Sequence, residues 1–378
     1  MLRFLDAGES HGRALIAIID GIPSNADIDI NFINNELKRR QGGYGRGKRM
    51  NIEKDKVKIY SGLRGNKTTG NPITMIIYNK DFENWKNAME QQPKENERIT
   101  IPRPGHGDFV GYFKYNTNDI RDVIERTSAR ETAIRTAVGA LCKSILFKLN
   151  IDIRSKIQSL GKICDDKVDI YNDNIYDKIE SSPLRCFNEN IEEKMKNKID
   201  KCRKEGETLG GSIYISIKGV PLGIGSYTQW DRKLDAILSY SIMSLQGIKA
   251  VEFGEGLNVE KMGSEFHDNI YYHEGTFMRN TNNAGGIEAG ISNGENIIIK
   301  AYMKPIPSVK KTMHTVDLKS RINVESRYER SDITGVVPAS IVLENICAFE
   351  ILKQLIDKFP SDTFQELKNS LKEYRNKI

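Results

Sequence analysis

Arg-Glu-Thr-Ala-Ile-Arg-Thr-Ala-Val-Gly-Ala-Leu-Cys-Lys-Ser-Ile-Leu-Phe-Lys-Leu, residues 130–149, is the most strongly patterned segment of the chain. Apolar side chains recur at three- and four-residue steps through Ile134, Val138, Leu141 and Ile145. This spacing places them on one face of an α-helix, and such a face must be buried against other elements. The segment therefore predicts a long helix that packs into the core.

Strand patterns lie on both sides of this helix. Residues 212–218 alternate strictly, with Ile213, Ile215 and Ile217 on one face, which predicts a half-buried strand. Further strands are expected at 14–19, 57–60, 73–78 and 297–303, and further helices at 29–40, 232–246, 337–359 and 362–374. Helices and strands are thus mixed along the chain. Residues 165–206 are polar with little pattern before Ile191 and are interpreted as a surface excursion or a boundary, and the lysine-rich stretch 192–204 is typical of a solvated helix face.

Composition restricts the class of protein. The 378 residues are 38% hydrophobic and 29% charged with a net charge of +6, values typical of a globular protein. No stretch approaches the ~18 apolar residues of a membrane span, and the first motif begins too early for a signal peptide. The five cysteines are odd in number and form no CxxC pair, which indicates reduced thiols and a cytoplasmic location.

Motifs are spread over nearly the whole length, which indicates that one site gathers distant loops. We therefore expect a single domain over residues 1–378, with 362–378 as a charged terminal helix or tail.

Two of the five histidines lie between glycines, in Gly-Glu-Ser-His-Gly at 8–12 and Arg-Pro-Gly-His-Gly-Asp at 103–108. Histidine titrates near physiological pH, and flanking glycines let a backbone approach a ligand closely. A pair of ordinary turn histidines is the alternative. The remaining histidines, at 267, 273 and 314, lack the spacing of metal ligands, so we expect no metal site.

Positive charge is concentrated at residues 38–49, where six cations are interspersed with glycines. The segment 42–48 matches GxxxxGK, but Arg49 stands where a phosphate-binding P-loop has Ser or Thr. Arginine guanidinium groups match phosphate and carboxylate geometry, so the segment is interpreted as an anion site. The alternative is a nucleic-acid-binding tract, which would want more interleaved aromatics than Tyr44 alone.

Residues 126–132, Arg-Thr-Ser-Ala-Arg-Glu-Thr, open the long helix in this interpretation. Hydroxyls and backbone N–H groups at a helix N-terminus can bind an anion. Ser128 followed by Glu131 also fits an ordinary capping box, and both interpretations can hold together. Further loops that could contact a ligand lie at 283–287, 304–308 and 330–332.

Taken together, GESHG, RRQGGYGRGKRM, RPGHGD, SARET, AGGI and RSD, in this order, resemble the chorismate synthase family over nearly the whole chain. The resemblance implies an α+β fold in one large domain, with helices packed between two antiparallel sheets. It implies loss of phosphate from 5-enolpyruvylshikimate 3-phosphate by 1,4-elimination to give chorismate. The reaction needs reduced FMN although no net redox change occurs.

The resemblance to the family assigns roles to individual residues of this chain. The resemblance implies that His11 is the acid beside the departing phosphate and that His106 protonates reduced flavin. Nearby anions should keep both rings protonated, as acids require. Asp332 matches the aspartate that takes a proton from flavin N5. Arg40 and Arg46 match arginines that bind the phosphate of the substrate or of NADP.

The resemblance also implies a set of FMN-binding residues. These are Arg126, Thr127, Ser128, Gln246, Gly247, Ala289, Lys304, Pro305, Ile306, Pro307, Ser308 and Arg330. The chain departs from the common family pattern at several of them. Gln246-Gly247 replaces Asn-Ala, Ala289 replaces glycine, 305–308 replaces Pro-Thr-Ser-Ser, and Ser331 replaces histidine. Contacts made through the backbone would tolerate these changes.

Family members are usually homotetramers, and they divide by how FMN becomes reduced. Some use NADPH themselves, whereas others depend on an external reductase. The chain has no appended reductase domain and no dinucleotide fingerprint after a strand, which favours the dependent kind. Two other functions stay open from the residues alone: a nucleic-acid-binding module that uses residues 38–49, and a conventional flavin oxidoreductase. The lyase interpretation expects a small-molecule substrate and neither a nucleic-acid nor a membrane partner.

Overall fold

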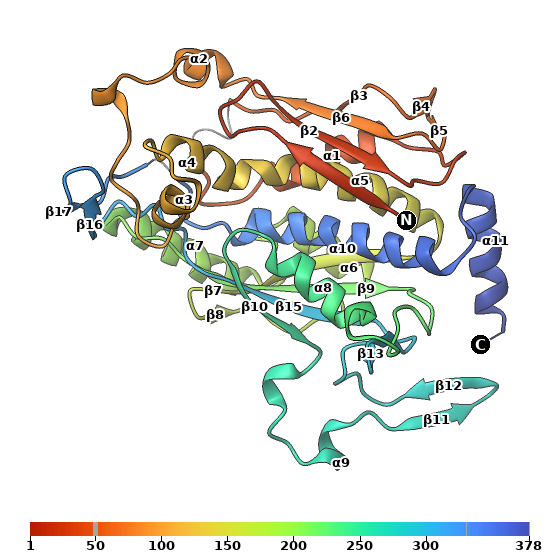
Figure 1. Cartoon of the computed structure of the whole chain (residues 1–378). Helices are drawn as coiled ribbons and strands as arrows, with labels where there is room; N and C mark the ends of the chain where they lie inside the picture. Colours follow the sequence, from red (N-terminus) through yellow and green to blue (C-terminus); the bar gives the residue numbers. More distant parts are fainter. Residues whose placement is uncertain (48–51, 330, 378) are drawn as a thin grey trace.

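Two antiparallel sheets enclose a layer of helices in the computed structural model, which describes residues 1–47, 52–329 and 331–377 (Figure 1). One sheet has the order β1-β2-β6-β3 and the other the order β10-β15-β9-β7-β8. The first sheet comprises β1 (Arg3–Ala7), β2 (Ala14–Asp20), β6 (Ile73–Tyr78) and β3 (Lys58–Ile59). The second comprises β10 (Ile248–Phe253), β15 (Ile297–Met303), β9 (Gly211–Lys218), β7 (Asp152–Leu160) and β8 (Ile163–Cys164). This is the predicted α+β architecture.

Three helices form the centre of the layer: α1 (Ile30–Gln41), α5 (Thr132–Lys148) and α10 (Val336–Lys358). Helix α5 packs against strands of both sheets and against α1 and α10. The sequence predicts one apolar face for this helix, but nearly every side chain from Thr132 to Leu146 is buried. Burial on all sides follows because the helix has a sheet above it, a sheet below it and a helix on each side.

The closest approach in this layer is between α5 and α10. A Cβ atom placed on Gly139 would lie 2.1 Å from the backbone oxygen of Asn345. Glycine is thus required for the two backbones to lie this close.

A cluster of buried charges also joins this layer. The Glu344 carboxylate of α10 accepts hydrogen bonds from Arg39 at 2.8 Å, Lys143 at 2.5 Å, Arg185 at 2.9 Å and Ser155 at 2.6 Å. Its side chain is fully buried. Such a carboxylate is tolerated in the interior because every lone pair has a partner.

The remaining elements surround this sandwich. The helices are α2 (Phe82–Glu90), α3 (Asp108–Tyr115), α4 (Arg121–Thr127), α6 (Asp173–Ser181), α7 (Glu189–Glu205), α8 (Leu234–Met243), α9 (Gly263–Phe266) and α11 (Phe364–Arg375). Short 3₁₀ turns are η2 (Glu95–Glu97), η3 (Ala129–Glu131), η4 (Trp230–Arg232) and η5 (Gly256–Asn258). Two-stranded pairs are β4 (Leu63–Arg64) with β5 (Lys67–Thr68), β11 (Ile270–His273) with β12 (Thr276–Arg279), β13 (Ile287–Glu288) with β14 (Ile291–Ser292), and β16 (His314–Asp317) with β17 (Ile322–Glu325).

Two sequence expectations differ from the structure. The polar segment 165–206 contains two helices, α6 and α7, and α7 buries Met195, Ile199 and Cys202. The solvated helix face predicted at 192–204 thus belongs to α7, whose other face is buried. Strand β9 is buried on both faces, with Ser212 and Ser216 on the side expected to face solvent. Among the described residues, no helix is long and apolar enough to cross a membrane.

Candidate active site

The first histidine loop is docked onto helix α4. His11 Nδ1 lies 2.9 Å from Glu125 Oε1, and the backbone N–H of His11 donates to Glu125 Oε2 at 2.8 Å. The His11 ring stacks on Trp85 of α2, with ring centroids 4.1 Å apart. Gly8 has φ +113° and leaves no room for a Cβ atom beside Ala14, so the loop can turn tightly here.

The second histidine loop precedes helix α3 and has a similar arrangement. His106 Nδ1 lies 2.5 Å from Asp108 Oδ1, and the side chain of Asp108 is fully buried. Arg103 donates to Asp108 Oδ2 at 2.9 Å and lies against the ring of His106. Hydrogen bonds from His106 and Arg103 overcome the effect of burial and hold the pKa of Asp108 well below its usual range.

The two histidine loops meet at the end of α4. A Cβ atom on Gly107 would lie 2.9 Å from Thr127 Cγ2, so the second loop touches this helix. Ser128 Oγ donates to Ser10 Oγ at 3.0 Å, which brings the first loop to the same place. Helices α3 and α4 lie at one end of the helix layer, far from α11 (Figure 1).

Residues 126–128 therefore do not open the long helix. Arg126 and Thr127 end α4, Ser128 caps it, and α5 begins only at Thr132 after the turn η3. The predicted capping box is not formed, because Ser128 accepts from Arg130 N and the Glu131 carboxylate accepts from Gln246 instead. The Arg126 side chain extends to Asp6 at 3.0 Å.

Buried arginines lie beside this junction. Arg40 donates to Thr132 Oγ1 at 3.0 Å and to the carbonyl of Ala129 at 3.2 Å. Burial and the neighbouring cations of Arg130 and Arg46 lower the pKa of Arg40 to about 10. Burial also lowers the pKa of Arg46. Both groups keep their charge at neutral pH, in surroundings where an added anion would be favourable.

Asp332 is engaged by the arginine–glycine segment. Its carboxylate lies 2.6 Å from Arg46 Nη1 and accepts the backbone N–H of Gly47 at 2.6 Å. Two of the residues that the sequence assigns to different roles, Arg46 and Asp332, are thus direct partners. The sequence predictions for Lys48, Arg49 and Arg330 fall outside the described residues.

Residues 304–308 complete this end of the molecule. Lys304 Nζ donates to the carbonyl of Gly105 at 2.6 Å, and Ser308 Oγ accepts from Arg103 at 2.8 Å. Pro307 lies near Gly105, and Ile306 lies near Gly335 just before α10. Pro305 follows Lys304 in the same loop, between β15 and β16. The loop therefore lies against the His106 loop.

Gln246 and Gly247 lie beside the same segment. The carbonyl of Gly247 accepts from Lys304 N at 2.9 Å, and Gln246 Nε2 donates to Glu131 at 2.7 Å. The other amide atom of this side chain, Gln246 Oε1, is buried without a hydrogen-bond partner among the described residues.

Ala289 does not join this group. It has φ +50° in the turn between β13 and β14, and neighbouring Gly290 accepts from Leu234 N at the start of α8. Gln246 lies beyond the other end of α8. That helix has 10 residues, so its ends are about 15 Å apart at 1.5 Å per residue.

Sequence reasoning assigned no role to three side chains that hold the histidines: Glu125, Asp108 and Arg103. Asp108 lies two residues after His106 in the quoted motif, and this spacing was its only signal. Glu125 is separated from His11 by 114 positions, so no local pattern could link them.

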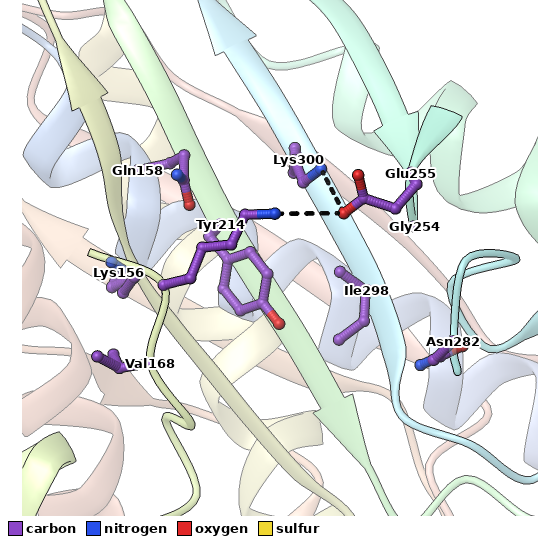
Figure 2. A pocket seen from close by; sticks show the side chains of 10 residues that line it. Lys156, Gln158, Val168, Tyr214, Gly254, Glu255, Asn282, Ile298 and Lys300 are labelled. Carbon is purple, nitrogen blue, oxygen red and sulfur yellow. Dashed lines mark ion pairs between the residues drawn. The ribbon is translucent and has the colours of Figure 1, made fainter. Parts of the chain in front are cut away.

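A separate groove lies elsewhere. It encloses about 210 Å³ on the outer face of the five-stranded sheet and is lined by Tyr214, Lys156 and Lys300 among others (Figure 2). Lys156 pairs with Asp165 at 2.6 Å, and Lys300 pairs with Glu255 at 3.7 Å. None of the predicted site residues lines this groove, and its cations are neutralised by their own neighbours. In the part of the chain that the structure describes, no group of His, Cys, Asp and Glu could hold a metal ion.

Comparisons with known proteins agree on one family. The family model described as "Chorismate synthase" matches residues 2–356. The chain is 63% identical to a chorismate synthase of Clostridium tetani over 100% of this chain and 98% of the relative. It is 51% identical to one of Alkaliphilus oremlandii over 100% and 99%. A solved chorismate synthase structure superposes with a TM-score of 0.81 at 37% identity, covering 100% of this chain and 98% of the other.

Proposed function

The chain belongs to the chorismate synthase family, and from that premise we propose that the loops around His11 and His106 form its active site. The chain is a lyase that eliminates phosphate from 5-enolpyruvylshikimate 3-phosphate to give chorismate, the last step of the shikimate pathway. What we add is the assignment of this chemistry to particular side chains.

The observation that carries the assignment is the convergence of two carboxylate-bound histidines with buried arginines. Each histidine uses Nδ1 to contact a carboxylate, which makes Nε2 the candidate atom for proton transfer; in His106 this atom lies 3.3 Å from Arg103 Nη2. Arg40 and Arg46 lie buried nearby, paired with Asp55 and Asp332 respectively, and burial lowers the pKa of both guanidinium groups, so a further anion would stabilise their charge. A phosphate of charge about −1.5 to −2 supplies that anion.

In this assignment each group has one task. Arg40 and Arg46 bind the substrate phosphate, and His11 gives a proton at Nε2 to the departing phosphate oxygen. His106 holds a proton at Nε2 for the reduced cofactor. Asp332 accepts the proton that leaves the substrate ring. It can do so once the bound anion has drawn Arg46 away from the Asp332 carboxylate. General acids and bases of this kind contribute roughly 10²–10⁴-fold each.

The residues present fit a flavin mononucleotide. Gln246 Oε1 is buried, has no partner in the part of the chain that the structure describes, and could accept a hydrogen bond from a cofactor N–H or O–H group. Lys304, Arg126, Thr127 and Ser128 lie around the same junction, where a phosphate and polar ring edges would find donors. Reduced FMN, when bound, supplies transient electron donation to the allylic system of the substrate, from which the phosphate departs.

Ala289 is the exception, because the length of α8 separates it from Gln246. We do not place it in the site that this chain forms by itself. NADPH takes part only if flavin reduction is intrinsic, and we propose that an external reductase supplies the electrons.

We also propose that the protein is a homotetramer in the cytoplasm. Five free cysteines support a reducing compartment. Exposed apolar side chains on the β11–β12 hairpin, such as Tyr272 and Phe277, support assembly, since isolated hairpins rarely expose such area. Light scattering on purified protein distinguishes a tetramer from a dimer.

An anaerobic assay tests the proposed function. Purified protein is mixed with substoichiometric FMN, dithionite and 5-enolpyruvylshikimate 3-phosphate, and chorismate absorbance and phosphate release are followed. We expect many turnovers per flavin, with one phosphate per chorismate. Product formed only in proportion to an electron acceptor would instead indicate a conventional flavin oxidoreductase. Affinity for nucleic acid that falls steeply with salt, without flavin retention, would indicate a nucleic-acid-binding module.

A further inference from the structure

We propose that Glu125 is the positioning residue of His11. Its buried carboxylate fixes the orientation of the imidazole and keeps a proton on Nδ1, so that Nε2 is the atom that exchanges a proton with the substrate. This inference rests on the proposed role of His11 as the acid beside the departing phosphate.

The first argument is geometric. The carboxylate of Glu125 contacts the His11 ring and the His11 backbone together, with Nδ1 at 2.9 Å from Oε1 and the backbone nitrogen at 2.8 Å from Oε2. The backbone carbonyl of Glu125 accepts from Ser10 N at 2.9 Å as well. One residue of α4 thus holds both the loop and the ring.

Trp85 also holds one face of the His11 ring. Trp85 stacks on His11 at an interplanar angle of 29°, and Arg121 lies over the Trp85 ring at 4.9 Å. Arg121 Nη1 also donates to Glu125 Oε1 at 3.3 Å. The ring cannot rotate to offer Nδ1 to a ligand without breaking the stacking and the hydrogen bond together.

The second argument concerns protonation. The hydrogen bonds and charge of His11, with a smaller contribution from Arg121, outweigh burial and lower the pKa of Glu125. The carboxylate is therefore ionised at neutral pH and can only accept hydrogen bonds. Nδ1 must carry a hydrogen to bond with it, whether the ring is charged or neutral. Only Nε2 can then gain or lose the proton.

The groups that face the His11 ring come from two helices. Helix α4 contributes Glu125 and Arg121, and α2 contributes the uncharged Trp85. The side chain of Glu125 is 2% exposed and that of His11 is 13% exposed, so solvent screens their interaction weakly.

Glu125→Gln tests the inference. The carboxylate offers Oε1 to His11 Nδ1 and Arg121 and offers Oε2 to the backbone N–H of His11, whereas the amide has only one oxygen. One of the two positions must then hold the amide NH₂ group, which leaves a donor without its acceptor and removes the fixed preference for a hydrogen on Nδ1. We expect kcat to fall roughly 10- to 100-fold, as for loss of an orienting partner of a functional histidine, with KM nearly unchanged.

The pH profile separates positioning from a merely structural role. Removal of a buried negative charge beside the ring should move the alkaline limb of the kcat profile to lower pH. Glu125→Asp keeps the charge and should keep the position of this limb. An unchanged kcat and an unchanged limb in Glu125→Gln would overturn the inference.

A second readout needs neither substrate nor cofactor. Only five histidines are present, so ¹⁵N-histidine labelling with one His11→Gln reference spectrum assigns the His11 ring. We expect the neutral wild-type ring to carry its hydrogen on Nδ1 and the Glu125→Gln ring to populate the Nε2–H tautomer as well. His106, which is held by Asp108, should not change between the two spectra and is the internal control. A wild-type His11 with its hydrogen on Nε2 would disprove the positioning, even if the variant fails to fold.

The acid role of His11 and the positioning role of Glu125 can be disproved separately. If the spectra behave as expected but His11→Gln turns over at the wild-type rate, then the acid role of His11 is wrong while Glu125 still positions the ring. If His11→Gln is inactive but the wild-type ring carries its hydrogen on Nε2, then the acid role stands and the inference about Glu125 is wrong.

Discussion

The two candidate catalytic histidines share one design at the scale of the residue. Each lies in a glycine-containing loop and contacts a carboxylate through Nδ1, Glu125 for His11 and Asp108 for His106. Each carboxylate is buried and ionised, so it accepts hydrogen bonds and does not compete for the catalytic proton. The two sites differ in the side chain that lies against the ring, which is Trp85 for His11 and Arg103 for His106.

His106→Ala removes the second acid. We expect turnover to fall roughly 10²–10⁴-fold, with substrate and FMN affinity nearly unchanged, because the ring acts on a proton and not as a binding group. Titration calorimetry for binding and the anaerobic assay for turnover measure the two effects. Full activity would remove His106 from the mechanism.

Arg46→Ala acts on binding. The guanidinium supplies buried positive charge and holds Asp332 at 2.6 Å. Its loss should weaken the affinity for the phosphorylated substrate by roughly 1.5–3 kcal/mol, the usual range for a hydrogen bond to a charged group. Arg3→Ala is the matched control, since that side chain is 72% exposed and paired with Asp20 on the surface. Equal affinity in Arg46→Ala and wild type would contradict the anion-site interpretation.

At the scale of the element, the crossing of α5 and α10 sets the spacing of the helix layer. Gly139 allows the α5 backbone to approach Asn345 more closely than any other residue could. Both helices continue to the end of the molecule that carries the candidate site, α5 through the turn η3 and α10 through Asp332 just before it. A substitution at the crossing should therefore disturb the packing of the whole helix layer.

Gly139→Ala tests this crossing. In an exposed helix the change would stabilise by roughly 1 kcal/mol, but here the added Cβ meets backbone, so we expect destabilisation by roughly 1–3 kcal/mol or more. Urea unfolding followed by circular dichroism measures it. Gly263→Ala in α9, whose new Cβ would have only the His267 side chain within 4 Å, should change stability by less than about 0.5 kcal/mol. Stabilisation by Gly139→Ala would refute the close-contact argument.

At the scale of the whole molecule, the buried charges around Glu344 join helices, a sheet and the α6–α7 connection. Arg39 comes from α1, Lys143 from α5, and Arg185 from the loop after α6. Glu180 of α6 accepts from Arg39 at 2.7 Å. The cations of Arg39, Lys143 and Arg185 hold the pKa of Glu344 well below its usual range, and those of Arg185 and Arg39 lower the pKa of Glu180 to about 2.

Acid should therefore weaken the fold in a defined range. A carboxyl with a depressed pKa in the folded state contributes stability that is complete above its unfolded pKa of about 4.5 and is lost as the pH falls towards its folded pKa. We expect the free energy of unfolding to decline from about pH 4.5 down towards pH 2. Denaturant titrations at a series of pH values measure the slope.

Glu344→Gln shows whether this cluster causes the decline. The variant leaves buried cations without their partner, so it should be less stable at neutral pH by roughly 3–5 kcal/mol and should lose less on acidification. Glu205→Gln is the control, because Glu205 is half-exposed and pairs with Lys201 at 3.8 Å, an arrangement that contributes at most about 1 kcal/mol. Equal acid sensitivity in Glu344→Gln and wild type would assign the decline to other carboxyls.

The sequence by itself determined the local structure and the family. Periodicity predicted the helices at 29–40, 130–149 and 337–359 and the strand at 297–303, because a 3.6- or 2-residue repeat reports which face is buried. The order of short motifs identified the chorismate synthase family, which the comparisons confirm. These signals lie within a few residues of one another, and so they can be read along the chain.

Only the tertiary structure decided which side chains meet. Glu125 holds His11 across 114 positions, and Arg46 holds Asp332 across 286. It also placed Ala289 beyond the far end of α8 and turned the expected capping box at Ser128 into two separate contacts. The physical reason is that hydrogen bonds and ion pairs act over a few ångströms of space. Packing of the sheets on the helix layer, and not the spacing in the chain, sets those distances.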